Sequence, residues 1–157
     1  RAALYQHFRN KEDLFRSVSV RLHDEVMVQA RAAFTQEGPV MARIEHALLA
    51  FVLGLLAPIA ASEHGQELVD INMAVAADIT GEAKQVLLAS MTQALADADA
   101  NGEIDLAAAR TGAAELAETI LAAADGLKHA ESGLEKLPAR LSLLIRLFDT
   151  ALRPAGS

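Results

Sequence analysis

The chain has 157 residues, the usual size of one compact domain, and 52% of them are hydrophobic while only 4% are aromatic. This composition, rich in Ala and Leu, is typical of helices, and the alternating Val, Ile, Thr and Tyr runs of strands are few. The absence of cysteine excludes disulfides, thiolate metal sites and cysteine nucleophiles. We therefore expect an all-α helical bundle without a cofactor.

The net charge of −7 is unevenly distributed along the chain. Arg1, Arg9 and Lys11 are three of the 14 basic residues, and residues 1–11 contain no acid, so the rest of the chain carries eleven bases against 21 acids. An acidic surface does not attract a phosphate backbone. Any contact with nucleic acid is therefore expected within the first eleven residues.

The start of the chain shows no secretory signal pattern. The most apolar stretch, residues 47–61, contains Gly54 and Pro58 and is shorter than the roughly 20 residues of a membrane span. We expect this stretch to be a buried helix, and the protein to be cytoplasmic.

About six helices are expected. Asn10 is a good N-cap and is followed by Glu12 and Asp13, so the first helix begins there, and it runs to about Phe34. The second starts near Val40 and is apolar on all sides beyond residue 47. Apolar spacing predicts the others around residues 68–79, 86–95, 106–127 and 137–152, with breaks at 62–65, 80–82, 97–105 and 132–133.

The opening segment carries the most specific motif. Leu4, Tyr5, His7 and Phe8 are followed by Lys11-Glu12-Asp13-Leu14. In the TetR family of transcriptional regulators, a recognition helix ends in Leu-Tyr-x-His/Tyr-Phe, and a Lys-Glu-Asp/Glu-Leu segment opens a long connecting helix. The chain resembles that family at these eight positions, and a match of this length is more specific than a single short motif.

The resemblance implies a ligand-responsive, DNA-binding repressor that acts as a homodimer and not as an enzyme. Residues 1–10 would be the end of the helix-turn-helix domain, and residues 11–157 the ligand-binding and dimerisation domain. Contacts to operator DNA are expected from Arg1, Tyr5, His7 and Lys11. The two helices that precede the recognition helix in the family are not in these 157 residues, so this chain alone is not expected to bind an operator specifically.

A ligand pocket for an apolar or amphipathic small molecule is expected within residues 40–95. Polar or flexible side chains interrupt the apolar stretches of this region, as a pocket requires. The residues assigned to it are His46, Phe51, Leu55, Asn72, Met73 and Met91.

The last two helices are expected to form a homodimer interface about a two-fold axis, because each carries an apolar face. Family members dimerise through these helices. The residues assigned to the interface are Ala113, Leu116, Ile120, Leu141, Leu144, Ile145 and Phe148.

Residues 97–105 offer an alternative function. Asp97, Asp99, Asn101 and Asp105 follow the ligand spacing of a calcium-binding EF-hand loop, with Gly102 at the turn. The twelfth position, which should be a bidentate Glu, is Ala108. A helical calcium-binding module is therefore the second hypothesis, ahead of a helical enzyme. The five histidines are scattered without metal-ligand spacing, so no metal site is expected.

Overall fold

A computed structural model describes residues 8–60, 76–128 and 134–154 of the chain. Within these ranges it contains five α-helices and no strand, which confirms the all-α class. The remaining expected helix, over 68–79 and third in chain order, lies mostly outside the described residues. The helices are α1 (Lys11–Phe34), α2 (Val40–Ala60), α4 (Ala77–Ala100), α5 (Ala113–Lys128) and α6 (Leu137–Ala151), with a 3-10 turn, η2 (Leu134–Lys136), before the last.

Helix α1 begins where the sequence predicts it. The Asn10 side chain accepts a hydrogen bond from the backbone N–H of Asp13 at 2.8 Å. The Asp13 carboxylate in turn accepts one from the N–H of Arg9 at 3.1 Å. This reciprocal pair satisfies two backbone donors at the helix start and fixes the direction in which the chain enters α1.

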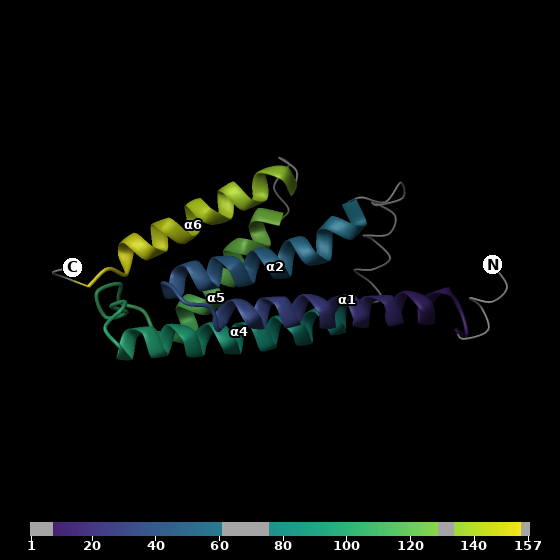
Figure 1. Cartoon of the computed structure of the whole chain (residues 1–157), viewed down its shortest axis with the longest axis horizontal. Helices are drawn as coiled ribbons and strands as arrows, with labels where there is room; N and C mark the ends of the chain where they lie inside the picture. Colours follow the sequence, from purple (N-terminus) through teal and green to yellow (C-terminus); the bar gives the residue numbers. More distant parts are fainter. Residues whose placement is uncertain (1–7, 61–75, 129–133, 155–157) are drawn as a thin grey trace.

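The helices are arranged around an antiparallel pair formed by α1 and α2 (Figure 1). Helix α4 packs beside α1 and runs in the same direction, whereas α6 packs on α2 and runs opposite to it. Helix α5 crosses from the α4 side of the molecule to the α6 side and contacts both.

The core lies where α2 meets its neighbours. Ile44, Leu48 and Phe51 of α2 are almost completely buried, as are Leu87 and Met91 of α4. Every residue of α2 from 47 to 56 is buried or half-buried, in agreement with a helix that is apolar on all sides.

The apolar part of α2 is longer than expected. Val40–Pro58 is long and apolar enough, by length and composition alone, to cross a membrane, which corrects the expectation that this stretch is too short. The core helix of a bundle passes the same test, and α2 contacts α1, α4, α5 and α6.

Two predicted helix boundaries are wrong. Helix α4 continues through Thr80, Gly81 and Glu82, where a break was expected, since one exposed glycine costs a helix only about 1 kcal/mol. Helix α5 begins at Ala113 and not near Leu106.

The segment before α5 forms a turn because polar groups close it locally. The Asp105 carboxylate accepts a hydrogen bond from the N–H of Ala108, and the N–H of Thr111 donates to the Leu106 carbonyl. Arg110 then adopts a left-handed conformation, with φ of 54°, which interrupts a helix.

The loop between α4 and α5 joins three helix ends. Glu103 accepts a hydrogen bond from the N–H of Val40 at the start of α2. The N–H of Asp105 donates to the carbonyl of Leu152 at the end of α6, at 2.8 Å. Ile104 and Leu106 are buried between these contacts. The loop therefore fastens one end of the bundle.

Candidate functional site

The residues predicted to contact DNA are described only in part. Lys11 is the first residue of α1 and is exposed. Arg1, Tyr5 and His7 lie outside the described residues. Glu12 and Asp13 follow Lys11 in the first turn.

Helix α1 is tied to the start of α4 by two polar contacts. The guanidinium of Arg16 binds the Asp78 carboxylate through two hydrogen bonds, of 3.0 and 2.5 Å. His23 is buried, and its Nδ1 lies 2.8 Å from the Ser19 carbonyl oxygen, an acceptor only, so Nδ1 carries a proton. Its Nε2 lies 2.9 Å from the Thr80 hydroxyl. These contacts hold the N-terminal half of α1 against α4, and this half begins with Lys11–Leu14, the end of the motif that resembles the TetR family.

The Arg16–Asp78 pair also changes the titration of the carboxyl group. The hydrogen bonds from Arg16 lower the pKa of Asp78 to about 2 and raise the pKa of Arg16. Both side chains are about half exposed, so the pair orients α1 more than it stabilises the fold.

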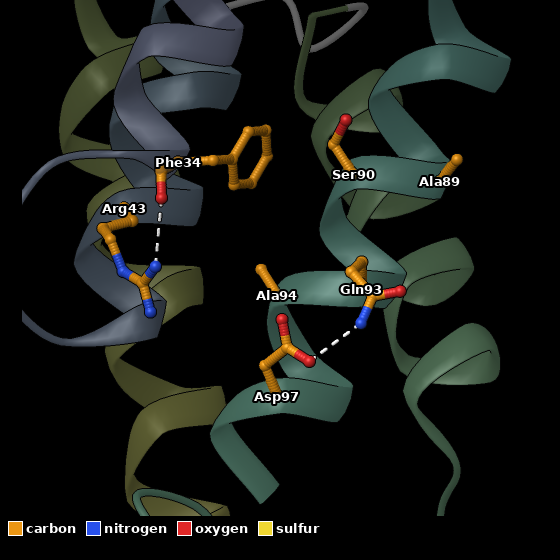
Figure 2. Close-up of a pocket in the computed structure, with 7 residues that line it drawn as sticks. All are labelled: Phe34, Arg43, Ala89, Ser90, Gln93, Ala94 and Asp97. Carbon is orange, nitrogen blue, oxygen red and sulfur yellow. Dashed lines mark hydrogen bonds between the residues drawn. The ribbon is translucent and has the colours of Figure 1, made fainter. Parts of the chain in front are cut away.

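A surface pocket of about 430 Å³ lies at the other end of α1 (Figure 2). It is formed where the end of α1 and the start of α2 face the second half of α4. Phe34 comes from α1, Arg43 from α2, and α4 supplies Ala89, Ser90, Gln93, Ala94 and Asp97. The Phe34 ring points from α1 toward α4, across the pocket from Ala94 (Figure 2). This volume lies within the range of small-molecule sites, although the pocket is open to solvent.

The two charged residues of the pocket differ in their partners. Arg43 donates through Nη1 to the Phe34 carbonyl at 3.0 Å, and its Nη2 lies 3.9 Å from Glu103. The Asp97 carboxylate accepts one hydrogen bond, from Gln93 Nε2 at 2.8 Å, and forms no ion pair within the described residues. Within the described residues Arg43 thus has an ion-pair partner, Glu103, although its buried Nε has no hydrogen-bond partner, whereas Asp97 has no ion-pair partner.

None of the six residues assigned to a pocket from the sequence lines this one. Phe51 and Met91 are buried in the core, and Leu55 is half-buried against it. His46 is exposed, and its Nδ1 lies 3.2 Å from the Gln36 side-chain oxygen. Asn72 and Met73 lie outside the described residues.

One feature of the sequence points to this pocket. Asp97 stands in the last turn of α4, which has no basic residue, although a carboxylate is unfavourable at a helix C-terminus. Phe34 and Arg43 gave no such signal, because their meeting depends on how α1 and α2 pack against α4.

The residues assigned to a dimer interface divide into two groups. Leu116, Ile120, Leu141 and Ile145 are buried within the single chain and form its core. Ala113, Leu144 and Phe148 are half-buried. The large exposed apolar side chains of α6 are instead Leu143 and Leu147, at 51% and 61% exposure. The dimer stays a prediction, and its surface on α6 would centre on these two leucines.

The part of the chain that the structure describes contains no cluster of acidic or histidine side chains that could hold a metal ion, so the structure does not support the calcium alternative. Asp97 and Asp99 lie in helix α4 and not in a loop. The Asp99 carboxylate accepts a hydrogen bond from the N–H of Leu106, and Asp105 caps Ala108, so two of the expected ligands hold the loop together.

Comparison with known proteins identified no relative: no family model, no curated protein and no solved structure matches this chain.

Proposed function

We propose that this chain is the helical body of a dimeric, ligand-responsive transcriptional regulator of the TetR type. The observation that carries the proposal is the motif from Leu4 to Leu14, with its eight matching positions. The capped start of α1 supports it, since Asn10 and Asp13 begin a long helix directly after the part that resembles a recognition helix.

The two contacts between α1 and α4 suggest how a ligand would act. A DNA-binding unit that precedes α1 would take its orientation from the N-terminal half of that helix. Arg16–Asp78 and His23–Thr80 hold this half on α4. A ligand that prefers a different arrangement of α4 and α1 would shift the population away from the DNA-competent state.

DNA selection with the whole protein encoded by the gene tests the proposal. The expected result is enrichment of a two-fold symmetric sequence, because a dimer presents two recognition helices. Lys11→Ala should weaken binding to all sequences alike and lower the salt slope by about one unit. Failure to enrich any sequence would contradict the proposal.

A further inference from the structure

The pocket between α1, α2 and α4 is lined by a carboxylate without an ion-pair partner, Asp97, and by an aromatic ring, Phe34, at its other end (Figure 2). Asp97 lies in the last turn of α4, where the partial negative charge of the helix end opposes it. No basic side chain within the described residues forms an ion pair with it. Asp97 is exposed and no cation of the described residues pairs with it, so its carboxylate is accessible to a cationic group entering the pocket.

Phe34 supplies the apolar side of the same pocket. It is the last residue of α1, it is half-buried, and its ring points toward α4 (Figure 2). Two of the α4 residues that line the pocket, Ala89 and Ala94, have small side chains, which leaves the pocket open. An aromatic face attracts both flat apolar groups and cations.

Arg43 does not cancel the attraction of the pocket for cations. Its Nη1 donates to the Phe34 carbonyl and its Nη2 lies 3.9 Å from Glu103, while its buried Nε has no hydrogen-bond partner within the described residues; the side chain is only 22% exposed. The net charge of −7 adds a long-range attraction for cations.

We propose that this pocket binds a small organic cation with a flat apolar group, the positive charge beside Asp97 and the flat group against Phe34. As an effector site the pocket rests on the proposed function, but binding itself does not require DNA. A volume of about 430 Å³ accommodates a cation of one or two rings.

Calorimetric titration of this chain with benzyltrimethylammonium tests the proposal. Wild type should bind it saturably at one site, whereas neutral benzyl alcohol and anionic phenylacetate should not saturate. Asp97→Asn should weaken binding about 10-fold, because a charged partner is replaced by a neutral one of the same shape. Phe34→Leu should weaken it about 5-fold, since an apolar contact remains without the ring.

The control is Glu118→Gln on the exposed face of α5, which changes the net charge equally but does not line the pocket. It should leave the affinity within about 2-fold, because Glu118 does not line the pocket and an exposed charge is screened by water and salt. Asp97 is exposed, so its variant should fold like wild type even if Phe34→Leu loosens the end of α1.

The proposed cation site would be contradicted if wild type showed no saturable binding, or if Asp97→Asn and Glu118→Gln lost the same amount of affinity. Such a result would leave the transcription-regulator proposal standing, because that proposal is tested with DNA. Conversely, if the protein bound the cation but selected no DNA sequence, the proposed cation site would stand and the transcription-regulator proposal would be contradicted.

Discussion

Gly54 of α2 lies directly against Val26 of α1, so closely that a Cβ atom on Gly54 would stand 2.6 Å from Cγ2 of Val26. Val26 is β-branched and 3% exposed, so its methyl groups have little freedom to move. Gly54→Ala is therefore expected to lower the free energy of unfolding by about 1–2 kcal/mol, because overpacking outweighs the gain in helix propensity. Chemical denaturation monitored by circular dichroism measures this change.

A matched glycine provides the control. Gly81 lies in α4, is exposed, and has nothing within 4 Å of an added Cβ. Gly81→Ala should raise the free energy of unfolding by about 0.5–1 kcal/mol. Val26→Ala should reduce the cost of Gly54→Ala in the double variant. If both alanine variants were stabilised alike, the close approach of α1 and α2 would be contradicted.

Asp78 should titrate unusually low because of Arg16. Its pKa is lowered to about 2, so the pair contributes stability above the ordinary carboxyl pKa and loses it as the pH falls toward 2. Carboxyl ¹³C NMR titration of Asp78 should show this pKa in wild type and a pKa closer to the ordinary 3.8 in Arg16→Gln. An unchanged titration in the variant would show that Arg16 does not hold the carboxylate.

Asp125 should be stabilising at neutral pH through its two lysines. Burial by itself raises the pKa of Asp125. Hydrogen bonds from Lys128 and Lys84 outweigh this effect, so the pKa of Asp125 is lowered overall. The carboxylate is partly exposed, so Asp125→Asn is expected to cost about 1 kcal/mol at pH 7 after allowance for solvent screening. This difference should shrink as the pH falls below the ordinary carboxyl pKa, which denaturation at several pH values measures. A cost independent of pH would assign the effect to packing.

The exposed leucines of α6 should decide the oligomeric state. Leu147→Glu should convert a dimer into a folded monomer, because it places a charge on a surface that the dimer buries. Ile120→Arg should instead unfold the chain, since Ile120 is fully buried and an unpaired buried charge costs about 3–5 kcal/mol. Sedimentation and circular dichroism distinguish the two. A wild-type protein that sediments as a monomer at micromolar concentration would contradict the prediction of a dimer.

The ends of several helices could be predicted because local chemistry sets them. Asn10, Gly38 and Pro39 mark the start and end of α1, and Leu137 begins α6 as its apolar spacing indicates. The interior of α4 and the start of α5 could not be predicted in this way. An exposed glycine does not break a helix, and the turn before α5 depends on side-chain caps that compete with helix formation.

The site was less predictable than the fold. Hydrophobic spacing shows which face of a helix is buried but not which helix covers it, so core residues such as Phe51 and Met91 were assigned to a pocket. The pocket found here joins Phe34 and Asp97, which are far apart in the sequence. Only the packing of α1 and α2 against α4 brings them together.

The central claim is that this helical body controls sequence-specific DNA binding, and the most direct measurement is the affinity of the whole gene product for DNA selected from its own genome. Fluorescence anisotropy at fixed salt should give a preference of at least about 10³-fold over random DNA, and a steep loss of affinity as salt rises. Equal affinity for selected and random DNA at every salt concentration would contradict the account.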